Sequence, residues 1–576
     1  MQMTQDGAVS RGPGVVSAEG ITWDEEFDVV VVGAGAGGFS SALNSHRLGS
    51  EVVILEKSGE VGGTMKKSAA WYWIPNNSLM RAAGVEDDKR DALRYMARLS
   101  RPQAYDSNDE RFGMSEWEFS MMEAFYDNAA RANDTLAEMG AIKPMYGPNV
   151  PDYHSEIPED TVPYGRTLFP EAPDGNPGKG PEMTRQFYAE VQRRNIPVLF
   201  HHAAETVVVD ASGAVVGLIA SAGGESRAFR ARQAVIFASG GFTHDRELRQ
   251  NFLQAPIMGG CAAQTNEGDF VRIATALGAP LRNMNFAWMA SMPLEIWLRG
   301  SPYTSGVFAI PGDSMIFVNK YGRRVVNEKA PYNEQAMAYF EYDPQNMEYP
   351  NLLLFIVWDQ RTHELWKATE ANEDTTPPRL ALDNYGNIVY DDFHVIKGES
   401  LEELTRNLEV RLGELAPHIG GFSLDEDFSS RLPETVERFN AFARAGKDPD
   451  FKRGDTPIEH TFNGEAKPDN DTGNATMYPM SRAGPYYAAI FSAGTLDTKG
   501  GPRTNTSGQI LGGDGEPIPG LYGVGNCVAS ASAQGYWAGG ATLGPILTFG
   551  YVAAEHATSQ PRRKPVEQST AGKRGQ

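Results

Sequence analysis

The chain has 576 residues and a net charge of −22 at pH 7, which excludes nucleic acid and anionic membranes as favourable partners. A chain of this length is too long to fold around a single ordinary hydrophobic core, which indicates two domains. The two cysteines, Cys261 and Cys527, offer neither a disulfide framework nor a cysteine metal site, and we expect no metal. No apolar run reaches the roughly 18–20 residues that span a bilayer, so we expect a cytoplasmic protein without a transmembrane segment.

The chain begins with a flexible segment and then a nucleotide-binding unit. Residues 1–24 are rich in Gly, Ser and Ala and lack the apolar core of a secretion signal, so we expect a flexible lead-in. Phe27–Val32 and Val52–Leu55 are predicted strands, and Gly33–Gly38 is predicted to form a tight turn that starts a helix. This order of strand, turn, helix and strand is that of a dinucleotide-binding unit.

The spacing Gly33-x-Gly35-x-x-Gly38 gives each glycine a physical role in that unit. Gly33 permits the turn, Gly35 lets the backbone approach a pyrophosphate, and Gly38 lets the helix pack closely on the strand. Free N–H groups and the helix dipole favour the phosphates at the helix N-terminus. Glu56 stands at the spacing expected for a carboxylate that binds an adenosine ribose.

Helices and strands alternate in the next part of the chain. Apolar residues at helical spacing predict helices over Asp88–Ser100 and Glu116–Gly140. Residues 144–180 are rich in Pro, Gly and Tyr and are interpreted as a long ordered loop that carries function. A further helix is predicted over 181–195. Strands that return to the first sheet are predicted over 205–210, 215–219 and 233–239.

Residues 290–480 differ from the preceding part of the chain in their sequence pattern, and we interpret them as a second domain inserted into the first. Strands are predicted at Ser314–Val318 and Leu352–Trp358, followed by an acidic helix-loop stretch through Arg444. The chain then ends with a glycine-rich strand and an apolar helix near Gly544–His556.

Two features favour FAD over NAD. Val61-Gly62-Gly63-Thr64 follows Glu56 directly and forms a turn whose amides would reach a second phosphate or the ribityl chain. Leu521–Asn526 ends a strand in glycine, and Gly535–Gly544 then opens a helix. The N-terminus of that helix would stabilise the negative N1–C2=O edge of a reduced flavin.

These motifs predict an α/β fold, α+β overall, in which a Rossmann-like FAD-binding domain contains an inserted α+β substrate domain. The expected boundaries are 1–24 for the flexible N-terminal segment, 25–290 for the first part of the FAD-binding domain, 291–480 for the substrate (catalytic) domain, 481–558 for the second part of the FAD-binding domain, and 559–576 for a disordered tail.

Further motifs extend across most of the chain. They are Gly33-x-Gly35-x-x-Gly38, Gly62-Gly-Thr64, Trp73-Ile-Pro-Asn-Asn77, Ala238-Ser-Gly-Gly-Phe242, Gly268-Asp269, Gly322–Glu328 and Gly484–Ala488. Together they resemble the fumarate reductase/3-ketosteroid dehydrogenase flavoprotein family. The branch of the 3-ketosteroid Δ1-dehydrogenases looks most similar, because Phe439–Gly454 and Tyr536–Pro545 are typical of it.

The resemblance implies non-covalently bound FAD. The residues expected to bind it are Gly33, Ala34, Gly35, Gly38, Glu56, Lys57, Gly62, Gly63, Thr64, Ser68, Ala69, Ala204, Ser239, Gly240, Asp269, Gly525, Asn526, Gly540, Ala541 and Leu543. An external electron acceptor, a quinone or a similar molecule, is expected to reoxidise the flavin.

The resemblance also implies chemistry by tyrosines and the flavin, without histidine or metal. Tyr332 matches the base that takes the α-proton of a cyclic ketone, while flavin N5 takes the β-hydride. Tyr536 and the N–H of Gly540 match the donors to the ketone oxygen, an oxyanion-hole arrangement. A free tyrosine titrates near 10, so the phenolate of Tyr332 needs a stabilising neighbour, and Tyr153 is the best match for it.

Departures from the family pattern leave the substrate open. Met65-Lys66-Lys67-Ser68-Ala69-Ala70 stands where the family usually has an uncharged segment ending in Ser-Gly-Gly, and Trp537 stands where steroid enzymes usually carry proline. The added methyl groups and Trp537 would narrow the pocket, so a smaller cyclic ketone of the cyclohexanone type is an alternative to a steroid.

Two other classes of protein compete with a ketone dehydrogenase. A fumarate-type reductase would need an arginine and histidine clamp for two carboxylates, whereas the final loop carries Tyr536-Trp-Ala. A non-enzymatic flavin-binding protein is the third class, although a buried flavin beside tyrosines has the ingredients of a redox site.

Overall fold

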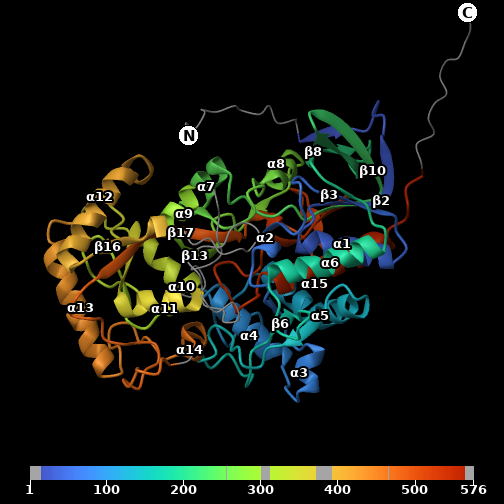
Figure 1. The fold of residues 1–576 in the computed structure, drawn as a ribbon. Coiled ribbons are helices and arrows are strands. Elements are labelled where there is room, and N and C mark those ends of the chain that lie inside the picture. Colours follow the sequence, from blue (N-terminus) through green and yellow to red (C-terminus); the bar gives the residue numbers. More distant parts are fainter. Residues whose placement is uncertain (1–13, 255, 300–311, 371–391, 465, 565–576) are drawn as a thin grey trace, which may run out of the picture.

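The computed structural model describes residues 14–254, 256–299, 312–370, 392–464 and 466–564 (Figure 1). Within these residues, nine strands form the first sheet. They are β1 (Val15–Ser17), β2 (Glu25–Val32), β3 (Val52–Leu55), β7 (Val198–Leu199), β8 (His202–Val209), β9 (Val215–Ala222), β10 (Glu225–Phe237), β19 (Gln509–Leu511) and β20 (Pro517–Gly523).

The centre of the first sheet is parallel. β2 runs parallel to β3 and to β10, and β10 runs parallel to β20. Val29–Val32 and Val52–Leu55 are buried along their whole length, as expected for parallel strands covered on both faces. The helices α1 (Ala36–Arg47), α6 (Gly180–Arg193) and α15 (Leu543–Ser559) lie together on one face of this sheet (Figure 1). The predicted Rossmann-like unit is therefore confirmed.

A second sheet forms the other half of the molecule. Its strands within the described residues are β11 (Gly259–Gly260), β13 (Ala287–Pro293), β14 (Met315–Val318), β15 (Leu353–Asp359), β16 (Ile396–Gly398) and β17 (Tyr486–Thr498). The helices α12 (Leu401–Ile419) and α13 (Phe428–Arg444) cover one face of it and lie at the outer end of the molecule in Figure 1. Leucines of α12 at positions 404, 408, 412 and 415 form its buried stripe against the strands.

The pairing of β17 departs from the expected domain boundaries. β17 lies within 481–558, the segment assigned from the sequence to the FAD-binding domain. Its partners, however, are β11, β13, β15 and β16 of the second sheet. The chain therefore crosses back to the first sheet only after Thr498, because β19 and β20 are the next strands to join that sheet.

Both ends of the described chain are attached to the first sheet. Within the expected flexible segment 1–24, β1 pairs in parallel with β8. Within the expected disordered tail 559–576, Arg562 lies 2.9 Å from Asp28, and the backbone N–H of Arg563 donates to the carbonyl of Arg232. These parts are ordered because strand pairing and a buried-carboxylate contact hold them. Residues 1–13 and 565–576 lie outside the described residues.

The two helices expected before the long loop are confirmed. α4 (Lys89–Ser100) is capped by Asp88, and α5 (Glu116–Glu138) begins with a capping box of Ser115 and Glu118. The loop at 144–180 contains β5 (Pro144–Tyr146) and β6 (Thr167–Pro170), which form a small sheet with β4 (Tyr72–Trp73). The loop is thus ordered by strand pairing.

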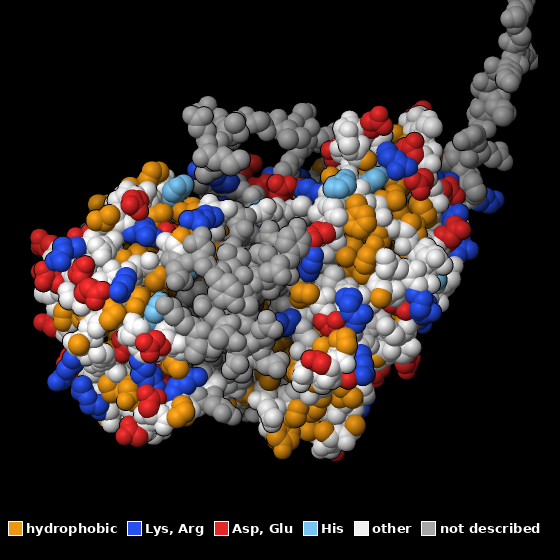
Figure 2. Space-filling view, viewed as in Figure 1, with side chains coloured by type: hydrophobic (Ala, Val, Ile, Leu, Met, Phe, Trp, Pro, Cys, Tyr) orange, Lys and Arg blue, Asp and Glu red, His pale blue; other side chains and the backbone are white. Residues whose placement is uncertain are grey.

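The remaining elements are short. The helices are α2 (Gly63–Lys66), α3 (Ser78–Ala82), α7 (Arg246–Phe252), α8 (Asp269–Ala276), α9 (Leu294–Leu298), α10 (Tyr332–Ala336), α11 (Gln360–Glu370) and α14 (Pro457–Asn463), and the strands are β12 (Leu281–Arg282) and β18 (Gly501–Pro502). Across the described residues, no helix combines the length and apolarity needed to cross a membrane. Basic and acidic side chains are interspersed over the face shown in Figure 2.

Candidate functional site

A cavity of about 670 Å³ lies at the carboxyl ends of the central parallel strands. Val32, Leu55, Phe237 and Val524, at or just after the ends of β2, β3, β10 and β20, line it from the first sheet. Leu496 and Asp497 of β17 line it from the second sheet. Ligands of open α/β sheets bind at this edge, so the topology itself places the candidate site here.

The glycine turn forms one end of the cavity. Gly33 has a φ of +103°, which only glycine adopts readily, and the N–H of Ala34 donates to Glu56 Oε2 at 2.7 Å. A side chain on Gly35 would point into open space, with only the Gly62 carbonyl at 3.9 Å. Gly63 faces Gly35 across the same space. This bare cradle at the N-terminus of α1 fits a pyrophosphate.

The structure brings the expected FAD-binding residues to this cavity with two exceptions. Gly38 lies inside α1, where a Cβ would meet the Gly33 carbonyl oxygen at 1.8 Å, so Gly38 permits packing and does not line the cavity. Ala541 is fully buried behind the wall. The other eighteen expected residues, from Gly33 to Leu543, line the cavity.

The buried carboxylate of Asp497 joins several of these wall segments. It accepts hydrogen bonds from Asn266 Nδ2 at 2.7 Å, from Asn526 Nδ2 at 3.0 Å and from the N–H of Gly241 at 3.1 Å. Burial raises the pKa of Asp497, and these donors oppose the rise. Asp497 thereby fixes three loops from distant parts of the chain around one side of the cavity. No sequence motif pointed to it.

Three tyrosines converge at the other end of the cavity. The hydroxyl groups of Tyr153 and Tyr332 are 2.7 Å apart. The ring centroids of Tyr332 and Tyr536 are 5.1 Å apart, and those of Tyr153 and Tyr536 are 5.5 Å apart. All three are at least 96% buried and line the cavity. Tyr153 comes from the loop between β5 and β6, Tyr332 is the first residue of α10, and Tyr536 lies in the segment before α15. These segments are far apart in the sequence, and folding brings the three side chains together.

Aromatic rings pack around these tyrosines. Trp288 meets Tyr536 edge-on at 5.0 Å, and Phe462 meets Tyr153 edge-on at 5.5 Å. Burial raises the pKa of Tyr332 and Tyr153 well above that of a free phenol, and it also raises the pKa of Tyr536. All three phenols are therefore protonated at neutral pH. Neither Trp288 nor Phe462 stands in a motif that the sequence analysis singled out.

Gly540 adds a backbone group to the tyrosine end. Its φ is +93°, and a Cβ would lie 2.4 Å from the Tyr72 backbone, so no other residue fits without a shift. Its carbonyl accepts from the N–H of Trp73 at 3.1 Å, whereas none of the described residues accepts a hydrogen bond from its own N–H. That donor is therefore available to a ligand in the cavity.

A buried ion cluster supports the loop that carries Tyr153. Arg166 pairs with Asp152 and with Asp87 and Asp160, at 2.8 and 3.0 Å for the last two. Asp152 also accepts from Trp73 Nε1 at 3.0 Å. Since Asp152 directly precedes Tyr153, this cluster fixes the position of the tyrosine.

His154 links the same loop to α10, which carries Tyr332. Its Nε2 lies 3.6 Å from Glu334 Oε1, and its Nδ1 lies 3.6 Å from Glu156 Oε1. Burial opposes a charge on His154, but the two carboxylates outweigh it and raise its pKa to about 10. His154 is thus a cation at neutral pH, held between the segments that carry the hydrogen-bonded pair of tyrosines.

This ion pair predicts a pH-dependent stability. The pKa of His154 is higher in the folded than in the unfolded chain, so its contribution is complete below pH 6.5 and is lost as the pH rises through about 10. We expect the melting temperature of His154→Gln to fall less than that of the wild type between pH 7 and 10. His418→Gln, at an exposed histidine, is the control. Parallel curves for wild type and His154→Gln would contradict the assignment.

The two departures from the family pattern that were expected to narrow the pocket lie in different places. Trp537 points into the core, where it packs against Phe125 and Trp73 and donates to Ser100 Oγ at 3.0 Å. It does not line the cavity, so the expectation for Trp537 is corrected. Ala69 and Ala70 do line it, and so does Trp71, which meets Phe169 edge-on at 5.4 Å.

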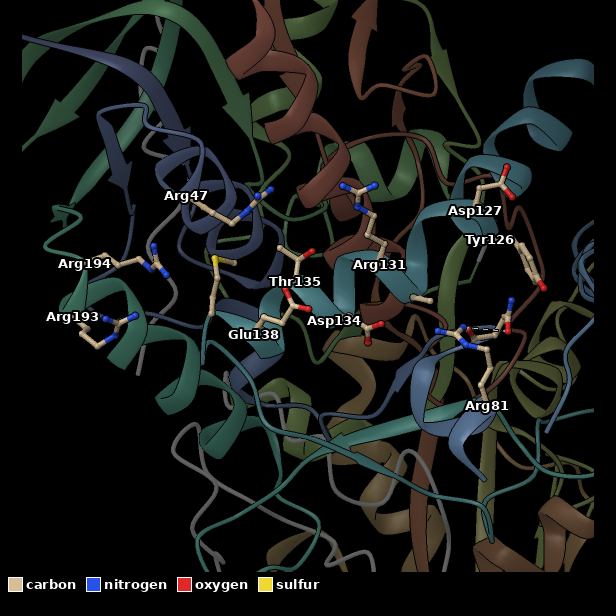
Figure 3. A pocket seen from close by; sticks show the side chains of 13 residues that line it. Arg47, Arg81, Tyr126, Asp127, Arg131, Asp134, Thr135, Glu138, Arg193 and Arg194 are labelled. Carbon is tan, nitrogen blue, oxygen red and sulfur yellow. Dashed lines mark hydrogen bonds between the residues drawn. The ribbon is translucent and has the colours of Figure 1, made fainter. Parts of the chain in front are cut away.

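A second cavity of about 820 Å³ lies outside this site, along α5 and the ends of α1 and α6. Figure 3 shows arginines and carboxylates spread around it. Arg47 pairs with Glu555, and Arg193 and Arg194 pair with Glu190, so protein carboxylates already neutralise much of its positive charge. None of the expected site residues lies in it.

Comparison with known proteins agrees with these features. The model of the family described as "FAD binding domain" matches residues 28–543. The 4-oxocyclohexanecarboxylate 2-dehydrogenase of Sinomonas cyclohexanicum is 30% identical over 93% of this chain and 93% of its own length. The 3-oxosteroid 1-dehydrogenase of Mycobacterium tuberculosis is 30% identical over 94% of this chain and 100% of its own length.

The fold also matches solved structures. The 3-ketosteroid delta1-dehydrogenase from Sterolibacterium denitrificans, in complex with 1,4-androstadiene-3,17-dione, matches with a TM-score of 0.75 and 23% identity. The match covers 93% of this chain and 99% of that chain.

Proposed function

This chain belongs to the FAD-binding domain family, in the branch of the 3-ketosteroid Δ1-dehydrogenases, and we propose that it desaturates a cyclic ketone to the enone. It is an FAD-dependent oxidoreductase that acts on CH–CH bonds. The observation that carries the proposal is the cluster of Tyr153, Tyr332 and Tyr536 at one end of the FAD cavity, beside the free N–H of Gly540.

In the proposed reaction, the protein activates the α-proton of the ketone. The hydroxyl of Tyr536 and the N–H of Gly540 donate to the ketone oxygen and stabilise the developing enolate. Tyr332 takes the α-proton, and the hydroxyl of Tyr153 donates to the oxygen of Tyr332 as its charge develops. Bound FAD, which we propose is held non-covalently, supplies the acceptor for the β-hydride, and an external acceptor such as a quinone takes up the electrons.

The substrate of the proposed reaction is either a 3-ketosteroid or a smaller cyclic ketone. The two relatives at 30% identity are named for these two kinds of substrate. Trp71 favours the smaller ring, because its indole lines the cavity directly after Ala69 and Ala70 and packs on Gly539.

A fumarate-type reductase is the other enzymatic candidate. It would bind two carboxylates with arginine, and within the described part of the chain no arginine lines the cavity. This observation supports the ketone dehydrogenase over the reductase.

Anaerobic mixing of the oxidised holoenzyme with a substrate panel tests the proposal. We expect androstenedione or cyclohexanone to bleach the flavin absorbance. The ketone that bleaches it faster identifies the substrate as a steroid or as a smaller cyclic ketone. Bleaching by succinate alone would favour the fumarate class. No bleaching by any ketone would overturn the proposed function.

A further inference from the structure

Lys67 is a cation on the cavity wall that the proposed mechanism does not use. It directly follows α2 and lines the cavity. Its Nζ donates to the carbonyl oxygens of Cys261 at 2.7 Å and Ala262 at 3.3 Å. These two bonds hold the side chain against the backbone of Cys261 and Ala262.

No protein carboxylate neutralises this charge. Among the described residues, none of the Asp or Glu side chains lies within 4 Å of Lys67 Nζ, and the neighbours that face it are Cys261 and His244. Burial lowers the pKa of Lys67 to about 8, which leaves it mostly charged at neutral pH. The adjacent Lys66 differs, because its Nζ lies 2.7 Å from Glu60. A half-buried cation without a counter-ion is unfavourable unless a ligand supplies the anion.

Lys67 is connected to the tyrosines through Cys261. Cys261, whose carbonyl accepts from Lys67, lines the same cavity as Tyr332 and Tyr536 and lies near enough to raise the pKa of Tyr536. The phosphate cradle at Gly35 and Gly63 lies at the start of α2, whereas Lys67 follows its last residue. The substrate is therefore a better source of an anion for Lys67 than the phosphates of FAD.

We propose that Lys67 binds a carboxylate carried by the ketone substrate, so that the enzyme prefers cyclic keto acids to uncharged cyclic ketones. This inference rests on the proposed function and specifies its substrate class. A charge-assisted hydrogen bond from the ammonium to the carboxylate completes the coordination of Nζ beside its two carbonyl acceptors. The ketone oxygen of the same molecule then reaches Tyr536 and Gly540.

The test compares a charged and a neutral ring on the holoenzyme. The probes are 4-oxocyclohexanecarboxylate and 4-methylcyclohexanone, and the variants are Lys67→Met, Lys67→Arg and the control Lys66→Met. Lys67→Met is expected to raise KM for the carboxylate probe by on the order of 10- to 100-fold, the effect of one lost charge-assisted hydrogen bond. Its constants for 4-methylcyclohexanone are expected to stay within about 2-fold. Lys67→Arg is expected to retain most of the preference, and Lys66→Met all of it.

A binding measurement separates this inference from the proposed reaction. Cyclohexanecarboxylate has no ketone, so its Kd, measured by perturbation of the flavin spectrum, reports only carboxylate recognition. We expect Lys67→Met to weaken this binding by a similar factor while the affinity for FAD is unchanged. Equal losses for both ketones, unchanged constants for both, or loss of FAD alone would overturn the role of Lys67. Lys67-dependent binding without any flavin bleaching would overturn the proposed reaction and leave the carboxylate site standing.

Discussion

Replacing Tyr332 by phenylalanine is expected to lower turnover by about 10²-fold or more, the scale of a lost general base. The substitution removes one hydroxyl at the first residue of α10 and leaves the ring contacts with Tyr153 and Tyr536 in place. FAD is expected to stay bound, because Gly33, Gly35 and Gly63 form the phosphate cradle and Tyr332 is no part of it. Turnover with a ketone and the flavin absorbance of the purified variant measure the two effects.

The same variant is expected to change the pH profile. Burial raises the pKa of Tyr332, so its phenolate is the minor form at neutral pH and wild-type turnover should rise with pH. In Tyr332→Phe this rise is expected to disappear. Tyr342→Phe, at an exposed tyrosine outside the cavity, is the control. Near-normal turnover in Tyr332→Phe, or an unchanged pH profile, would show that another group is the base.

The elements that could be predicted from the sequence are those determined by local signals. The strands at Val29–Val32 and Val52–Leu55 are continuous apolar runs, and the turn at Gly33 needs a positive φ. Helices α4 and α5 carry caps directly before their apolar pattern. Each of these signals lies within a few residues, so one segment suffices to predict it.

The features that sequence reasoning missed depend on contacts between distant segments. The pairing of β17 with the second sheet follows from the register of several strands. Trp537 turns into the core because Phe125 and Ser100 meet it there. Asp497 has no motif of its own, since its partners Asn266 and Asn526 come from separate loops. Local spacing carries no information on such contacts.

Replacing Arg166 by leucine is expected to destabilise the fold by about 3–5 kcal/mol, the effect of removing one partner of a buried ion pair. Arg166 is fully buried, and its loss would leave Asp87, Asp152 and Asp160 without their shared cation. Arg185→Leu, which breaks an exposed pair with Glu182, is expected to cost less than about 1 kcal/mol. Urea unfolding of the two variants measures the difference, and equal effects would contradict the role of the cluster.

The ionisation of Asp160 provides an independent test of the same cluster. Burial and the neighbouring charge of Asp152 raise the pKa of Asp160 to about 7, although Arg166 opposes the rise. Because the folded pKa lies above the unfolded one, the stability that Asp160 contributes is complete below about pH 4 and is lost as the pH rises through about 7. Asp160→Asn keeps the shape of the protonated acid, so it is expected to gain stability relative to the wild type between pH 5 and 8. A constant difference between the two proteins over this range would show that Asp160 is already ionised in the folded protein at pH 5, and would contradict the raised pKa.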